Sequence, residues 1–263
     1  MKSIIEKARY GLPFSDELII DSHCHFGSHF ANVIPYSTPE EIITNMDRIG
    51  IDKACFMTSS AGIYGDEMLH ARQLADFVNK YPDRLYGYVA LPMNYREAIL
   101  EHYLKCEAMG LNIGVKMHTY CQKYDVTESF IHPIYERLNK KHGLIIHHDF
   151  GPPGPLEDLL KAYPNIAFIA GHMDFNTNRY ISLLKKYDNF YNCTCATLRY
   201  DEVREFTAKI GSEKIIHGSD LVVLDSTLGF GPILYANITN QEKLNILGLN
   251  MEKLLKKIKY NKN

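Results

Sequence analysis

The sequence alternates between short, continuous apolar runs and longer segments in which apolar residues recur at helical spacing. Such runs are typical of buried parallel strands, and such segments of the amphipathic helices that pack on them. The predicted strands are residues 18–22, 53–58, 85–91, 113–118, 144–148, 166–172, 190–195 and 214–219. The predicted helices are residues 39–49, 67–81, 96–109, 130–142, 156–163, 179–187 and 202–210, with a last helical region after residue 231. Each strand is followed by a helix, which predicts an α/β fold of the (β/α)8 TIM-barrel class.

Local chemistry supports these boundaries. Thr38 and Glu41 form a capping box around Pro39, and Gly50 stands where the same helix is expected to end. No segment rich in proline, glycine and serine interrupts the series of strands and helices. We therefore expect a single barrel domain over residues 1–263.

Composition narrows the classes of partner. Hydrophobic residues make up 46% of the chain and charged residues 23%, which are ordinary values for a globular protein. The formal net charge of -2 lacks the basic excess that binding to nucleic acid or to an anionic membrane normally requires. No apolar run reaches the ~20 residues of a membrane span, and the six cysteines suit a reduced compartment. A small-molecule substrate and a cytoplasmic location are expected.

Histidines at the ends of the predicted strands are the first functional lead. His23 and His25 follow the first strand, and because side chains alternate along a strand they project to the same face. His147, His172 and Asp220 stand at the ends of strands five, six and eight. In a barrel these ends meet at one rim. Imidazole and carboxylate donors suit Zn²⁺ and also accept Mn²⁺, Fe²⁺ or Ni²⁺.

Three other residues near these positions are expected to have structural roles. His148 directly follows His147, so it is expected to face the helical layer. Cys193 and Cys195 share one face of the seventh strand, but no second cysteine pair accompanies them. They are expected to be small core residues.

The ordered motifs resemble the amidohydrolase superfamily, and within it the amidohydrolase 2 branch, which includes aromatic acid decarboxylases and lactone hydrolases. The resemblance covers most of the chain. Its parts are residues 20–25 (IDSHCH), 114–118 (GVKMH), 125–149, 171–172 (GH), 217–220 (HGSD) and 250–255 (NMEKLL). It implies a metal-dependent hydrolase in which a metal-activated water cleaves a C–O or C–N bond of a small substrate.

The resemblance also implies roles for particular residues. His23, His25, His147 and Asp220 would bind one divalent ion, with zinc the first expectation, and Asp220 would also act as the general base. His172 would be a second catalytic residue that polarises the substrate.

Lys116 and His118 share a face of the fourth strand, and both are expected to bind substrate. In binuclear members of the superfamily a lysine at this strand is carbamylated and bridges two ions. Such a role for Lys116 is the less favoured alternative to a mononuclear site.

Two other functions remain open. The same metal site could serve a decarboxylase of a small, aromatic carboxylic acid, although the compact chain argues mildly against this. A TatD-like nuclease is disfavoured, because Lys116 and the segment 217–220 depart from the pattern expected of that family. A homo-oligomer is compatible with the sequence.

Overall fold

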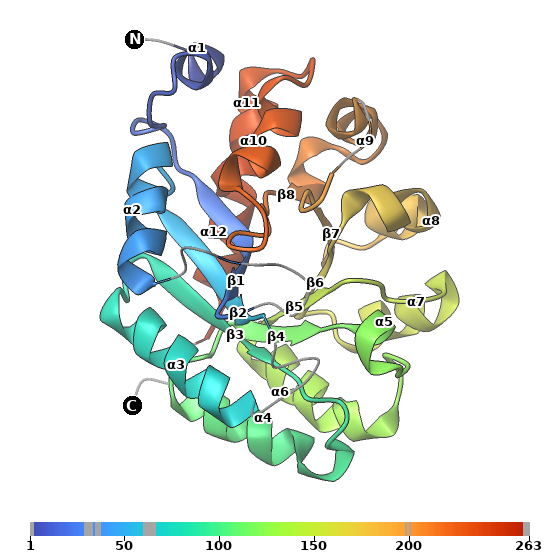
Figure 1. Cartoon of the computed structure of the whole chain (residues 1–263). Helices are drawn as coiled ribbons and strands as arrows, with labels where there is room; N and C mark the ends of the chain where they lie inside the picture. Colours follow the sequence, from blue (N-terminus) through green and yellow to red (C-terminus); the bar gives the residue numbers. More distant parts are fainter. Residues whose placement is uncertain are drawn as a thin grey trace.

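Eight parallel strands form the centre of the fold. The structure, a computed structural model, describes residues 3–28, 34, 38–59, 67–197, 199 and 201–259. Within these residues the strands form one sheet in the order of the sequence, and every neighbouring pair is parallel. They are β1 (Ile20–Phe26), β2 (Lys53–Thr58), β3 (Leu85–Ala90), β4 (Gly114–Met117), β5 (Leu144–His147), β6 (Ala167–Ala170), β7 (Phe190–Cys193) and β8 (Ile215–Ile216). Figure 1 shows the strands at the centre with helices around them.

The ring nearly closes between the segment after β8 and β1. The backbone N–H of Ser22 donates to the carbonyl of His217 at 3.0 Å, and that of Asp220 donates to the carbonyl of His23 at 2.9 Å. A parallel bridge also joins Cys24 and Leu221. The predicted (β/α)8 TIM barrel is confirmed.

Helices alternate with the strands as predicted. Those between β1 and β8 are α2 (Pro39–Ile49), α3 (Glu67–Lys80), α4 (Ile99–Ala108), α5 (Thr119–Gln122), α6 (His132–Lys141), α7 (Pro153–Ala162), α8 (Met173–Lys186) and α9 (Glu202–Ile210). After β8 come α10 (Ser226–Leu234), α11 (Asn240–Leu244), a π-helical turn at Asn245–Leu249 and α12 (Asn250–Lys257). The predicted capping box of α2 is present. A similar box between Ser3 and Glu6 begins α1 (Ile4–Arg9), which the sequence pattern did not predict.

The strands β6 and β8 are among those that end earlier than predicted. β6 ends at Ala170 and β8 at Ile216, so His172 and Asp220 lie in the segments that follow these strands. Both residues have a positive φ, 59° for His172 and 63° for Asp220, which is incompatible with extended strand geometry. The backbone therefore turns at the two positions where the sequence predicts chemistry.

Buried side chains form an inner and an outer layer. Leu144 and Ile146 of β5 belong to the cluster inside the barrel, while Ile145 packs in the cluster between the strands and the helices. Met251 and Leu254 of α12 join the inner cluster and fill one end of the barrel. The alternation along β5 decides which side chains beyond it can face the barrel axis.

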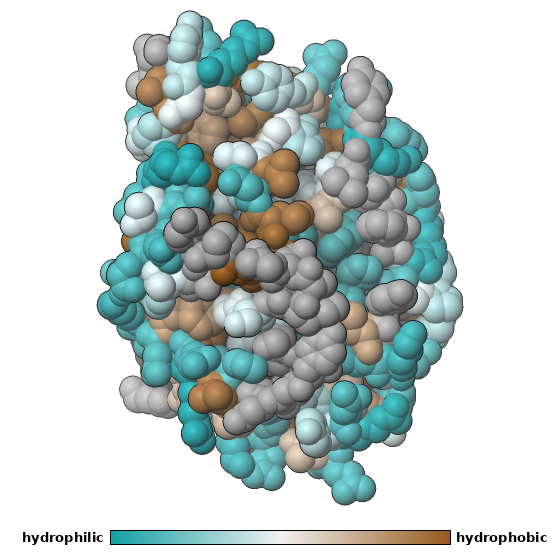
Figure 2. Space-filling view, viewed as in Figure 1, coloured by the Kyte–Doolittle hydropathy of each residue, from teal (hydrophilic) through white to brown (hydrophobic). Residues whose placement is uncertain are grey.

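The surface is mainly hydrophilic in the view of Figure 2, with hydrophobic side chains gathered near α1 and α10. Large exposed apolar residues there are Tyr10, Leu228 and Tyr235. None of the helices in the described residues combines the length and the apolar character that a membrane span requires.

Candidate metal centre

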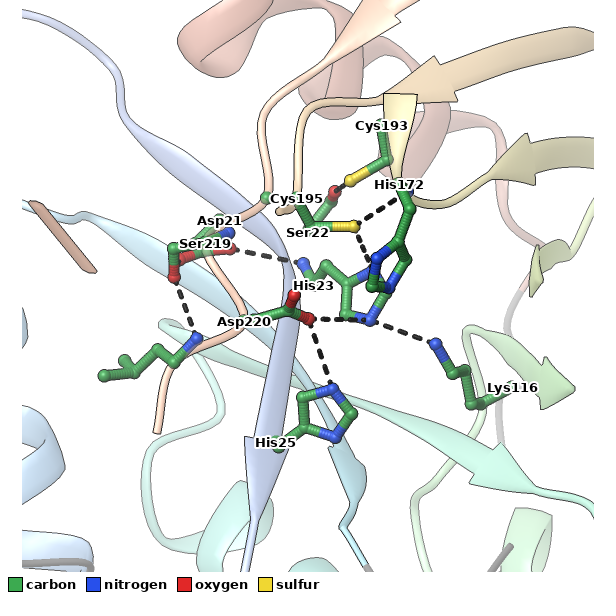
Figure 3. Close-up of polar contacts among 12 residues, drawn as sticks. Asp21, Ser22, His23, His25, Lys116, His172, Cys193, Cys195, Ser219 and Asp220 are labelled. Carbon is green, nitrogen blue, oxygen red and sulfur yellow. Dashed lines mark hydrogen bonds and ion pairs between the residues drawn. The ribbon is translucent and has the colours of Figure 1, made fainter. Parts of the chain in front are cut away.

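One carboxylate oxygen of Asp220, after β8, lies close to two histidines of β1. Oδ1 of Asp220 lies 3.2 Å from Nε2 of His23 and 3.3 Å from Nε2 of His25 (Figure 3). Ligand atoms that bind one ion through bonds of ~2.1 Å are themselves ~3.0–3.4 Å apart in octahedral or tetrahedral geometry. Asp220 therefore stands at the distance of a fellow ligand from each of two histidines that the sequence predicts to bind the ion.

The carboxylate of Asp220 is also poorly satisfied by the protein alone. Its Oδ1 is buried, and among the described residues it has no hydrogen bond of ordinary geometry. Burial by itself would raise the pKa of Asp220, but His23, His25 and His172 outweigh it and hold the pKa well below its ordinary value. A cation in front of Oδ1 would satisfy this oxygen.

The backbone around the site is held by a buried carboxylate and a glycine. Asp21 accepts the hydroxyl proton of Ser219 and the backbone N–H groups of His23 and Ser219. A Cβ on Gly218 would come within 2.7 Å of Cβ of His23, so only glycine fits between β1 and the segment after β8. These contacts fix where Asp220 stands relative to His23.

Lys116 brings a positive charge into the same centre. Its Nζ lies 3.0 Å from Nε2 of His23, and the side chain is 7% exposed. Within the described part of the chain the ammonium has no carboxylate at ion-pair distance. Burial lowers the pKa of Lys116, as expected for a cation without such a partner.

His147 does not face this centre. Its Nδ1 accepts the backbone N–H of Asp149 at 2.9 Å, so the ring proton is on Nε2 and is donated to the hydroxyl oxygen of Tyr124 at 3.0 Å. The ring is fully buried beside Phe150 in the outer layer, and burial lowers its pKa well below the ordinary value. Both nitrogens are thus used outside the barrel axis, and the prediction that His147 points inward is wrong.

His148 takes the inward position instead, in phase with Leu144 and Ile146. Its ring centroid lies 4.3 Å from that of His172 and 4.6 Å from that of His118. The three imidazoles therefore form a row from the end of β4 to the start of α8, next to His23, whose ring is 5.9 Å from that of His172. Burial lowers the pKa values of His118 and His172 to about 3, so these rings are neutral at pH 7. His118 and His172 flank His148 in this row. The expectation that His148 faces the helices is wrong.

Cys195 is buried as predicted, but it is not only a core residue. Its Sγ lies 3.1 Å from Nδ1 of His23, and it belongs with His23, His172 and Asp220 to a group whose possible ligand atoms all lie within 4.8 Å of one another. All six cysteines are free thiols. Sequence reasoning missed this contact, although Cys195 stands at a strand end on the same face as Cys193.

Comparison with known sequences identifies the family. A family model described as amidohydrolase matches residues 20–257. This chain belongs to that family. The match spans every strand of the barrel and all the residues of the candidate centre. No curated protein matches the sequence.

Solved structures with the same fold include decarboxylases of aromatic acids. The 2,6-dihydroxybenzoate decarboxylase from Rhizobium has 15% sequence identity and a TM-score of 0.71, and the match covers 91% of this chain and 99% of that one. A dihydroxybenzoic acid decarboxylase from Polaromonas sp. JS666, with bound manganese and the inhibitor 2-nitroresorcinol, has 15% identity, 91% and 97% coverage and a TM-score of 0.71. The 5-carboxyvanillate decarboxylase from Sphingomonas paucimobilis has 12% identity, 91% and 99% coverage and a TM-score of 0.68. This chain spans nearly the full length of all three.

Proposed function

We propose that the centre binds one divalent metal ion through His23, His25, His148 and Asp220. The spacing of the first two histidines to Asp220 and the unsatisfied Oδ1 support this set. His148 replaces His147, because only His148 lies beside the other histidines of the centre. Imidazole and carboxylate donors suit zinc, and the manganese in the Polaromonas decarboxylase is compatible with the same donors. A bound ion would fix a substrate oxygen and withdraw electrons from the carbon attached to it.

We propose further that the substrate is a small carboxylate. The observation that carries this proposal is Lys116, a buried ammonium whose nearest partner is an imidazole rather than a carboxylate. Within the described residues, the possible ligand atoms that converge at the centre include one acidic side chain, Asp220. The positive charges of Lys116 and a divalent ion together exceed the single negative charge of Asp220. Buried charge without compensation is costly, and a substrate carboxylate would supply the compensation.

Decarboxylation is the reaction that these features support best. Lys116 would hold the carboxylate group, and the row of neutral imidazoles would orient the rest of the substrate. When the carbon–carbon bond breaks, CO₂ leaves and the carbon takes up a proton from solvent in its place. The decarboxylases among the structures with this fold support the same reaction class.

Hydrolysis of a C–O or C–N bond is the second candidate, and one observation favours it. Asp220 presents a buried, unbonded carboxylate oxygen to the point where His23 and His25 meet. A general base in hydrolysis needs such an oxygen to take a proton from water. His172 would then stabilise the negative charge that develops on the substrate oxygen.

One experiment separates the two reactions. The metal-loaded protein would be incubated with hydroxybenzoic acids labelled with ¹³C in the carboxyl group, and separately with lactones and N-acyl compounds that also carry a carboxylate. Decarboxylation predicts release of labelled CO₂ that Lys116→Met slows and that Arg96→Met, a surface control, does not. Hydrolysis products without CO₂ release would establish the second candidate, and turnover of uncharged substrates alone would contradict the carboxylate proposal.

A further inference from the structure

The sulfur of Cys195 contacts two nitrogens at the centre. It lies 3.1 Å from Nδ1 of His23, and the backbone N–H of His172 donates to it at 3.2 Å (Figure 3). Cys195 is fully buried just after β7, opposite β1. A single side chain therefore touches both the ring of one predicted ligand and the backbone of a predicted catalytic histidine.

The contacts of His23 determine which of its nitrogens carries the proton. An ammonium group can only donate hydrogen bonds, so Nε2 of His23 accepts from Lys116. An imidazole whose Nε2 accepts a hydrogen bond carries its proton on Nδ1, and Nδ1 of His23 faces Sγ of Cys195, to which it donates. In this tautomer Nε2 carries no proton, so its lone pair can bind an ion.

The thiol is itself supported by a polar row between β7 and β1. Cys193 contacts Cys195 from the same face. Sγ of Cys193 lies 3.7 Å from Oγ of Ser22, and the hydroxyl of Ser22 donates to the carbonyl of His217 at 2.6 Å. A Cβ on Gly218 would meet Sγ of Cys193 at 2.5 Å, so the row is tightly enclosed.

Cys195 contacts the ring nitrogen of His23 that is opposite the proposed ion site. The sulfur faces Nδ1, whereas Asp220 and Lys116 face Nε2. The lone-pair directions of the two ring nitrogens diverge, so an ion bound at Nε2 is separated from Sγ by the imidazole. Metal-binding histidines usually donate their other N–H to a carboxylate, a backbone carbonyl or water. Here a thiol takes that place.

We propose that Cys195 is a positioning residue of the metal centre: its sulfur accepts the Nδ1–H of His23 and the backbone N–H of His172, and thereby presents Nε2 of His23 to the ion. This inference rests on the proposed metal site but not on which reaction the site performs.

The test compares metal affinity among purified variants. The affinity of the metal-free full-length protein for Zn²⁺ is measured by competition with a chromophoric chelator in wild type, Cys195→Ala, Cys195→Ser and Cys55→Ala. Cys55 is an equally buried cysteine of the inner layer and controls for lost volume. Loss of a group that orients a metal ligand typically costs ~10- to 100-fold in affinity. We expect that loss in Cys195→Ala alone, with substantial rescue by the hydroxyl acceptor of Cys195→Ser.

Two results would overturn the inference. Equal affinities of Cys195→Ala and wild type would show that the sulfur does not position His23. A near-ultraviolet sulfur-to-cobalt charge-transfer band in the Co²⁺-substituted wild type, absent from Cys195→Ser, would show that Cys195 binds the ion directly. Failure of the proposed metal site is distinguishable from both, because the wild type itself would then not bind Zn²⁺ tightly.

Discussion

Replacing His147 and His148 by alanine, one at a time, should show that one residue supports folding stability and the other supports metal binding. His147→Ala removes the acceptor of the Asp149 backbone N–H and the donor to Tyr124. An unsatisfied buried polar group costs ~1–3 kcal/mol, and the cavity left by a large buried side chain adds ~2 kcal/mol or more. A loss of about 3–5 kcal/mol lowers the melting temperature of a chain of this size by roughly 6–20 °C.

His148→Ala should behave in the opposite way. Its residue is only partly buried and its ring lies beside two other imidazoles, so its loss should lower the free energy of unfolding less than the loss of His147 in the presence of a chelator. Metal affinity, in contrast, should fall by about 10²-fold or more, because losing a ligand costs at least as much as losing a group that orients one.

The assay is thermal unfolding with excess chelator, so that a bound ion does not add to stability, followed by Zn²⁺ titration of both variants. A His147→Ala protein that melts like wild type but no longer binds zinc would refute the assignment of the two rings. Normal zinc binding by His148→Ala would do the same.

Three further outcomes follow from the site and from the helical layer. Asp220→Asn keeps an oxygen for the ion but loses basicity, so metal should remain bound in substantial part; if hydrolysis is the reaction, turnover should fall by ~10² or more in steady-state assays. Lys116→Met should raise the KM of a carboxylate substrate about 10- to 100-fold, the value of a charged hydrogen bond, while leaving that of its uncharged analogue unchanged. Burial alone would raise the pKa of Glu107, but its bonds to Arg137 and Lys141 lower it overall. The stabilisation from Glu107 is therefore complete above its ordinary pKa of 4.5 and is lost as pH falls below it. In Glu107→Gln, the free energy of unfolding measured with urea should depend less on pH in this range.

The barrel was predictable because its signal is repeated and local. Buried parallel strands are apolar on both faces, and each is followed by a helix with a continuous apolar stripe, so eight independent runs agree. The same physics explains the error at β5. Leu144, Ile145 and Ile146 are all apolar, so the strand carries no alternation that tells which of the two following histidines faces inward.

Other parts of the centre depend on contacts between distant segments. His23 and His25 were predictable from strand periodicity, and Asp220 from its place after the eighth apolar run. The contact between Cys195 and His23 was not, because it is made across β7 and β1 and depends on the absence of a side chain at Gly218. The turns at His172 and Asp220 likewise arise from backbone geometry that residue type does not specify.

Metal content per chain is the most direct test of the proposal that His23, His25, His148 and Asp220 hold one ion. Elemental analysis of protein purified without chelator should find about one equivalent of a divalent transition metal in wild type and in His142→Ala, a variant of a helix-capping histidine remote from these residues. His25→Ala should contain far less. A fully active wild-type protein without stoichiometric metal, or a His25→Ala protein with the same metal content as wild type, would contradict the proposed centre.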